Sequence, residues 1–222
     1  GVLWRALFAD LSGSTAPMAN WRHRKGRGQA AAPDAAARGA GSRRRAVAGA
    51  IALALVAGGG WWWYVGQQAE DAFLAHAQRG EAALERVVRH DDEGTGHLAP
   101  GQSVRYRSDP PTSGIHDPRW TDPGVYQRPQ SRERLVHSLE HGMVVMIYHD
   151  RPTADALATL KDWAGLYGAP FSGIVLALKP GLNEAIILAA WRKTLRLDPF
   201  EADAAAAFID AYRGRGPEHP VR

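Results

Sequence analysis

The stretch LVHSLEHGMVVMIYH, Leu135 to His149, contains the two patterns that decide the fold and the candidate site. Its second half, VVMIYH (144–149), is an apolar and strongly β-branched run. A short run of this kind is typical of a buried strand. We therefore expect Val144 to Tyr148 to form a central strand of the fold.

The first half of the stretch carries two histidines. His137 and His141 are four residues apart, and Glu140 directly precedes the second of them. If residues 132–141 form a helical turn, the two imidazoles lie on one face, close enough to share a metal ion.

The segments after this stretch predict both helices and strands. Residues 153–168 and 201–214 have apolar residues at helical spacing, and each segment ends at a glycine. GIVLAL (173–178) and AIILAAW (185–191) predict two strands, and the Pro180–Gly181 turn between them favours a hairpin.

The segment before the stretch predicts one more strand and a long connection. HLAPGQSVRYR (97–107) reads as a short strand with Val104 and Tyr106 on one face. Residues 108–134 contain five prolines and two glycines, which rule out a continuous helix or a central strand. We expect an α+β fold: a small mixed-sheet α/β sandwich with helices on one face and a long Pro-rich loop.

An uncharged run indicates a membrane anchor. Residues 46–66 contain no charge and just suffice to cross a hydrocarbon core about 30 Å thick as a helix. Trp and Tyr at positions 61–64 suit one interface, and three arginines at positions 43–45 precede the run. This charge asymmetry predicts a cytoplasmic N-terminus and an extracytoplasmic remainder. A cleaved signal peptide is the alternative, although the run is long for one.

These features divide the chain into four parts. Residues 1–45 are expected to be a disordered basic cytoplasmic tail, in which 1–17, before Met18, are a candidate for non-native sequence. Residues 46–66 are the predicted transmembrane helix. A juxtamembrane helix or linker over 67–91, with a break near Gly80, leads to an exported domain over 92–222.

Composition excludes several classes of function. The chain has no cysteine, so disulfides and thiolate metal sites are excluded. Its net charge of +4 comes largely from the predicted tail, so the basic balance does not indicate nucleic-acid binding. The predicted partner is the membrane, and the sequence identifies no protein partner.

Several motifs carry a resemblance to a known family. GHLAPGQSVRY, PPTSGIHDPRW, HSLEHGM, the AAW at 189–191 and GRGPE occur in this order between about Gly96 and Glu218. Together they resemble a bacterial family of membrane-anchored proteins known as domain of unknown function 3105. The resemblance implies a shared fold but no activity. His97 and His116 lie inside these motifs, which implies a shared role for them.

The favoured hypothesis is a transition-metal site. Its candidate ligands are His137, His141, His116 and His97, with Glu140 as a partner of these ligands. Such a site suits copper or zinc, and a thioether from Met143 or Met146 would favour copper. The alternative is a histidine network that bonds backbone carbonyls and organises a non-catalytic interaction domain.

A zinc hydrolase is the less favoured alternative. HSLEH matches H-x-x-E-H, in which the glutamate is the general base, and Glu218 lies 77 positions beyond His141 as a distant third ligand. However, Gly142 and the β-branched run end any helix at once, whereas such peptidases place this motif in a long helix. A nucleophilic Ser113 near His116 is weaker still, because no G-x-S-x-G turn is present.

Overall fold

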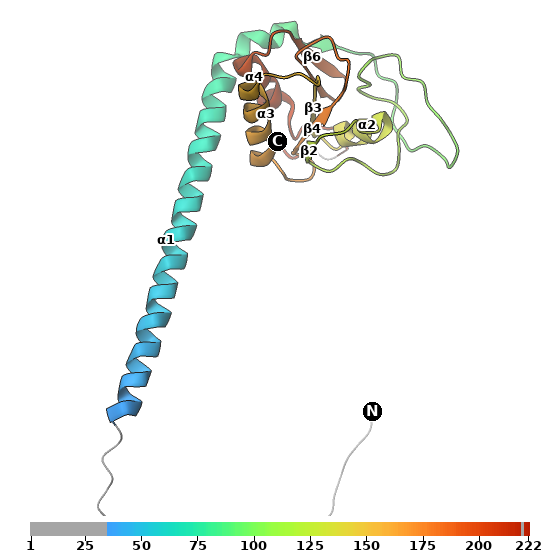
Figure 1. Ribbon diagram of the computed structural model, residues 1–222. Coiled ribbons are helices and arrows are strands. Elements are labelled where there is room, and N and C mark those ends of the chain that lie inside the picture. Colours follow the sequence, from blue (N-terminus) through green and yellow to red (C-terminus); the bar gives the residue numbers. More distant parts are fainter. Residues whose placement is uncertain (1–34, 219) are drawn as a thin grey trace, which may run out of the picture. The chain divides into compact units, whose positions relative to one another are not determined.

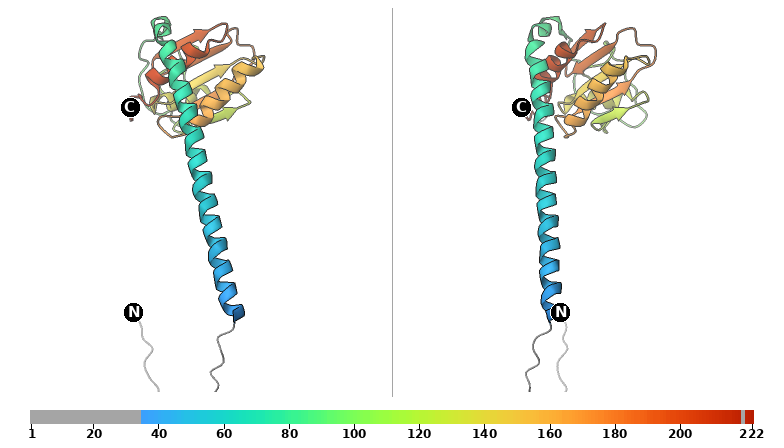
Figure 2. Two further views of the ribbon diagram at one scale, coloured as in Figure 1. Left: turned by 90° about the vertical axis from the view of Figure 1, so that its left-hand side faces the viewer. Right: turned by 60° about the vertical axis from the view of Figure 1, so that its left-hand side comes forward.

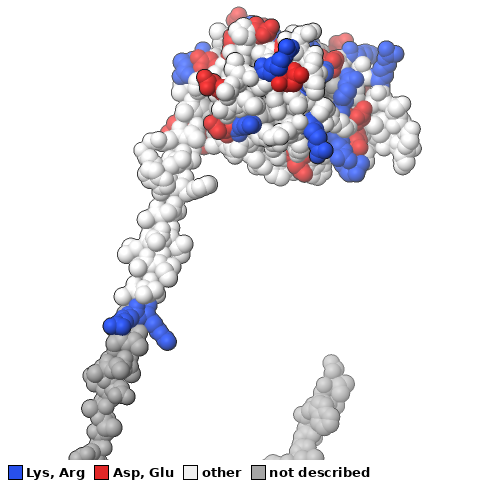
Figure 3. Space-filling model, viewed as in Figure 1, with Lys and Arg blue, Asp and Glu red and all other residues white. Residues whose placement is uncertain are grey.

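The computed structural model describes residues 35–218 and 220–222, with side chains from residue 43 onward (Figure 1). The predicted tail spans residues 1–45; residues 1–34 lie outside the described residues, and residues 35–45 belong to a helix. The long helix α1 (Ala35–Arg79) contains the predicted transmembrane run. Its segment Arg43–Arg79 is long and apolar enough to cross a membrane. The chain carries no Lys, Arg, Asp or Glu over residues 46–69, seen as the white part of the helix in Figure 3. An apolar helix of this kind is consistent with a membrane anchor.

The end of α1 belongs to the folded domain. Residues Leu53–Arg222 form one compact unit, and within it Phe73 is buried against the rings of Trp163 and Tyr167. The helix stops at Arg79, and Gly80 follows, where a Cβ would lie 1.9 Å from the carbonyl oxygen of Asp203. Only glycine fits so close to another backbone, so the expected break at Gly80 has a packing cause.

A six-stranded mixed sheet forms the centre of the domain. Its strand order is β1-β6-β5-β3-β4-β2. β3 pairs parallel with β4 and antiparallel with β5. The strands are β1 (Val88–Arg89), β2 (Gly124–Tyr126), β3 (Val144–Tyr148), β4 (Ile174–Leu178), β5 (Ile186–Ala190) and β6 (Lys193–Leu197). The prediction of β3 as a fully buried central strand is confirmed.

Helices cover both faces of this sheet, with α3 and α4 on one side of the strands and α2 on the other in Figure 1; Figure 2 shows the side of α3 and the end of α1. α3 (Ala154–Leu166), α4 (Ala202–Tyr212) and the end of α1 pack with one face, whose cluster includes Met146 and Phe208. α2 (Arg132–Glu140) packs with the other face, where Leu139 joins Val145. The α+β class is confirmed, and α2 adds a layer beyond the expected one-sided arrangement.

The predicted hairpin between residues 173–178 and 185–191 is wrong. β4 and β5 lie on either side of β3 and do not pair with each other. Strands are about 4.8 Å apart, so the connection over residues 179–185 has to span only about 10 Å to pass β3. The hairpin joins β5 to β6 instead, through Trp191 and Arg192.

The predicted strand over residues 97–107 is also wrong. In this segment only His97 makes a β-type backbone pairing, an isolated parallel bridge to His116. Tyr106 is buried, but not in the sheet: its ring lies against Gly114, and its hydroxyl donates to the Ile115 carbonyl at 2.8 Å. The alternation of Val104 and Tyr106 therefore reflects one buried side chain, that of Tyr106, and not a strand of the sheet. β1, β2 and β6 were not predicted, and each is either very short or polar on one face.

Candidate metal centre

The two histidines of the HSLEH motif lie at the end of α2. Ser131 caps the start of this helix by accepting from the Arg134 amide at 3.4 Å. The helix ends at Glu140, with His141 as the C-cap and Gly142 next at a φ of +96°. The expected helical turn is confirmed, and it places His137 and His141 on one face.

The long connection between β1 and β2 (residues 90–123) brings two further histidines to the same place. The amide of His116 donates to the Gly96 carbonyl at 2.9 Å, and the amide of Leu98 donates to the His116 carbonyl at 2.7 Å. These bonds align His97 beside His116, with their ring centroids 5.3 Å apart. The ring of His137 lies 5.0 Å from that of His97 and 4.7 Å from that of His116.

A hydroxyl ties this connection to α2. The Oγ of Ser138 donates to the Thr121 carbonyl at 2.8 Å and accepts from the Thr121 amide at 3.0 Å. Ser138 is fully buried, so both bonds are shielded from water. Because Ser138 directly follows His137, the contact fixes the connection against the histidine-bearing turn.

Backbone carbonyls determine which ring nitrogen carries the proton in two of the imidazoles. His116 Nδ1 lies 2.8 Å from the Gly114 carbonyl, and His137 Nδ1 lies 2.8 Å from the Asp117 carbonyl. A carbonyl oxygen only accepts, so each Nδ1 carries the proton and donates it. In a neutral ring this leaves Nε2 with a free lone pair. Metal-bound histidines are oriented in the same way, by a partner on the other nitrogen.

Burial favours the neutral form of the His137 imidazole. Desolvation lowers the pKa of His137, and the nearby His116 and His97 lower it further. The hydrogen bond to Asp117 and the charge of Glu140 oppose this change, without cancelling it. A neutral imidazole is the form that binds a metal ion.

The remaining ring nitrogens face one another and two carboxylates. His137 Nε2 lies 3.0 Å from His141 Nε2, which lies 2.8 Å from the Oε2 of Glu218. His116 Nε2 lies 3.1 Å from the Oε2 of Glu140 but makes no aligned hydrogen bond with it. A proton on one imidazole nitrogen can form a good hydrogen bond in only one of these contacts. A metal cation, in contrast, attracts several of these nitrogen and oxygen atoms at once.

The donor atoms form two groups that overlap at His137. Within each group the ligand atoms all lie within 4.8 Å of one another. The first group is His97, His116, His137 and Glu140; the second is His137, His141 and Glu218. All four predicted histidines are therefore gathered, but in two sets.

Glu218 was not among the ligands of the favoured metal-site hypothesis. The sequence offered it only under the less favoured alternative, as the distant third ligand of the zinc-peptidase motif. Met143 and Met146 do not belong to either group. Both are fully buried, and they pack in the apolar clusters on opposite faces of the sheet.

Aromatic rings enclose the second group. The ring of Trp120 lies 4.7 Å from that of His141, and Phe171 stacks on His141 at 4.6 Å. His116, His137 and His141 are buried, while the Glu218 side chain is 44% exposed. An ion from solvent would therefore reach the group on the side of Glu218.

Ser113 is engaged in structural contacts. Its hydroxyl accepts from the Glu93 amide at 3.0 Å and lies 3.4 Å from the Asp91 carbonyl. This arrangement holds the connection in place and does not direct the hydroxyl toward an activating base.

Comparison with known proteins gives one family. A family model described as "Protein of unknown function (DUF3105)" matches residues 97–222, more than half of the chain. The match includes every histidine and both carboxylates of the two donor groups. Neither the curated proteins nor the solved structures give a significant match to the chain.

Proposed function

The chain belongs to the DUF3105 family of proteins of unknown function, and we propose that its folded domain binds a transition-metal ion through the histidines around His137. The domain would be held at a membrane by α1, with the N-terminus cytoplasmic and the metal site outside the cytoplasm. The arginines at 43–45 and the aromatic residues at 61–64 support this orientation.

One observation carries the metal proposal. His116 and His137 each donate Nδ1–H to a backbone carbonyl, and so aim their Nε2 lone pairs into the cluster. There His137 Nε2 lies 3.0 Å from His141 Nε2, and His116 Nε2 lies 3.1 Å from the Glu140 carboxylate. The Glu218 carboxylate lies 2.8 Å from His141 Nε2. Buried lone pairs that face carboxylate oxygens repel each other unless a proton or a cation lies between them. A metal ion stabilises the whole arrangement.

The donor set indicates the class of metal. Imidazole nitrogen and carboxylate oxygen suit divalent zinc or copper, and the thioethers that would favour monovalent copper are buried elsewhere. Zinc binds imidazole at about 2.0–2.1 Å and needs four donors for a structural site, or three and a water for an open one. Each donor group supplies enough ligands for one of these arrangements.

A non-catalytic interaction domain is the main alternative. In that case the histidines would bond only to Gly114, Asp117, Glu140 and Glu218, and would organise the connection before β2 as a recognition surface. This alternative also needs at least one extra proton, to separate His116 from Glu140. It predicts that metal ions leave the stability of the domain unchanged.

Zinc-dependent hydrolysis has one observation in its favour. Glu218 does lie beside His141, as the H-x-x-E-H hypothesis requires of a third ligand. Against it, α2 ends at the motif and Glu140 is directed at His116. Glu140→Gln separates the two functions, since a hydrolase would lose activity and keep its metal, whereas a pure metal-binding domain shows no hydrolysis in either form.

Metal content of the purified chain tests the proposal. The full chain in detergent is loaded with Zn²⁺ or Cu²⁺ and dialysed, and bound metal is measured per chain. We expect stoichiometric metal in the parent and the largest loss in His137→Ala, because His137 belongs to both groups. His141→Ala, His116→Ala and His97→Ala report on the separate groups.

The matched control is His149→Ala, which removes an imidazole that lies outside both groups. Circular dichroism shows whether each variant stays folded. A parent chain that retains no metal, or a His137→Ala variant that binds as much as His149→Ala, would contradict the proposal and favour the hydrogen-bond network.

A further inference from the structure

We infer that Glu218 is a metal ligand, and that the loop Gly214–Arg222 holds its carboxylate beside His137 and His141. The inference rests on the proposed metal binding and makes it specific. The ion occupies the His137, His141 and Glu218 group, while His116 and Glu140 lie beside it. The structure describes all of this loop except residue 219.

The loop is closed at its base. The Gly214 carbonyl accepts from the amides of Val221 and Arg222 at 2.8 and 3.1 Å. The guanidinium of Arg222 pairs with Asp210 on α4 at 2.8 Å. Gly214 has a φ of +73°, which favours glycine at this reversal. Closure limits the positions that Glu218 can take.

The loop is also attached directly to the end of α2. The Gly214 amide donates to the Gly142 carbonyl at 2.8 Å, and the Glu218 amide lies 3.4 Å from the Glu140 carbonyl. A Cβ on Gly216 would lie 2.2 Å from both the Glu140 oxygen and the Gly142 nitrogen. Backbone therefore packs on backbone at the turn that carries His141, and this contact sets the position of the Glu218 carboxylate.

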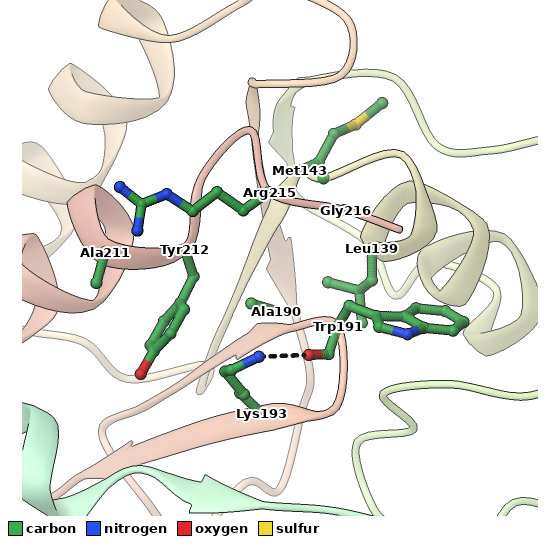
Figure 4. Close-up of a pocket in the computed structure, with 10 residues that line it drawn as sticks. Leu139, Met143, Ala190, Trp191, Lys193, Ala211, Tyr212, Arg215 and Gly216 are labelled. Carbon is green, nitrogen blue, oxygen red and sulfur yellow. Dashed lines mark hydrogen bonds between the residues drawn. The ribbon is translucent and has the colours of Figure 1, made fainter. Parts of the chain in front are cut away.

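The other side of the loop faces a cavity of about 190 Å³. Arg215 and Gly216 line it, together with Leu139, Trp191 and Tyr212. Figure 4 shows the Arg215 guanidinium beside Ala211, on the opposite side from Gly216. The Arg215 cation is thus directed toward α4, away from Gly216.

The ligand atoms of the His137, His141 and Glu218 group indicate which class of metal ion it would bind. Two imidazoles and one carboxylate form a mixed nitrogen and oxygen set, which suits divalent zinc and disfavours monovalent copper. Three protein ligands leave at least one position for water or a small anion. The partly exposed Glu218 lies on the side where such a ligand would enter.

Substitution of Glu218 tests the inference in the full chain in detergent. We expect Glu218→Gln to weaken Zn²⁺ binding by more than about tenfold, since even the outer partners of metal ligands contribute about 10- to 100-fold. With Co²⁺ as the probe, the visible absorption of the parent should change in this variant. Glu218→Asp, which keeps the carboxylate, should recover part of the affinity.

Two controls separate ligation from loop structure. Arg222→Gln removes the contact with Asp210 but no ligand, and should keep the Co²⁺ spectrum. Glu201→Gln neutralises a carboxylate that lies outside both donor groups, and should also keep this spectrum. Gly216→Ala, with Glu218 intact, should lose Zn²⁺ affinity because the loop must move away from the end of α2.

The outcomes distinguish this inference from the proposed function. If the parent binds no metal, the proposed function fails. If the parent binds Zn²⁺ and Glu218→Gln binds it equally, with an unchanged Co²⁺ spectrum, only the role of Glu218 is overturned. A larger effect of Glu140→Gln than of Glu218→Gln would place the ion among His97, His116 and His137 instead.

Discussion

His137 and His141 direct their Nε2 atoms at each other across 3.0 Å. Two nitrogens bound at about 2.0–2.1 Å to one ion are about 2.8–3.4 Å apart, for bond angles between about 90° and 109°. The side chains therefore already have the separation of neighbouring ligands. Little rearrangement would be needed on binding, which favours affinity.

Metal retention should depend on pH in a defined direction. The pKa of His137 is lowered from its usual value near 6.5, chiefly by burial, so the ring stays neutral at pH values where an exposed histidine is protonated. We expect bound Zn²⁺ to be constant above about pH 6.5 and to be lost only below it. Equilibrium dialysis over a pH series measures this. Loss of metal already well above pH 7 would contradict the neutral, preformed site.

Tyr106 should make the domain sensitive to alkali. Burial raises the pKa of Tyr106 above its usual value near 10. Above pH 10 the unfolded chain loses this proton while the folded chain keeps it, so stability falls as pH rises. Tyr106→Phe should remove this part of the alkaline loss, although it loses the hydrogen bond to Ile115, worth about 1 kcal/mol at neutral pH.

Thermal unfolding of the parent and of Tyr106→Phe between about pH 8 and pH 11 provides the comparison. The midpoints should converge as pH rises. Parallel curves over this range would show that the Tyr106 proton is not linked to folding.

A charge at the centre of β3 should unfold the domain. Val145 is 1% exposed and packs between the sheet and α2. Val145→Asp buries an unpaired carboxylate, at a cost of about 4 kcal/mol or more, a large share of the stability of an ordinary domain. Val125→Asp on the edge strand β2 is the control, because Val125 is 40% exposed. If both variants melted at the parent temperature, the core position of β3 would be wrong.

The proposed orientation in the membrane can be tested with a reporter. The arginines at 43–45 predict that everything after the apolar run is extracytoplasmic. A reporter that is active only outside the cytoplasm, fused after Arg222, should therefore be active. A full-length but inactive fusion would reverse the orientation.

Local patterns predicted the elements better than their arrangement. β3 was recognisable because a continuous β-branched run favours a buried strand, and α3 because its apolar residues recur at helical spacing. The placement of β3 between β4 and β5 depends on pairing across the sheet, which no local period encodes. The proline–glycine turn was read as a hairpin for the same reason.

In the candidate site, too, the local arrangement was predictable from the sequence, whereas the contacts between distant segments were not. The spacing of His137 and His141 placed them together, because helix geometry is local. His97 and His116 could be added only from the motifs that carry them. Glu218 reaches His141 through close packing of two glycine backbones at Gly142 and Gly216, and a glycine in a sequence does not reveal what approaches it.

The closed base of the loop also determines where an affinity tag can be placed. The Arg222 amide is bonded to the Gly214 carbonyl, so a polyhistidine tag fused after Arg222 would start five positions after Glu218, next to the base of the same small loop. Its imidazoles would compete for the ion and raise the apparent stoichiometry. A non-coordinating tag placed ahead of α1 avoids this artefact and keeps the metal titrations interpretable.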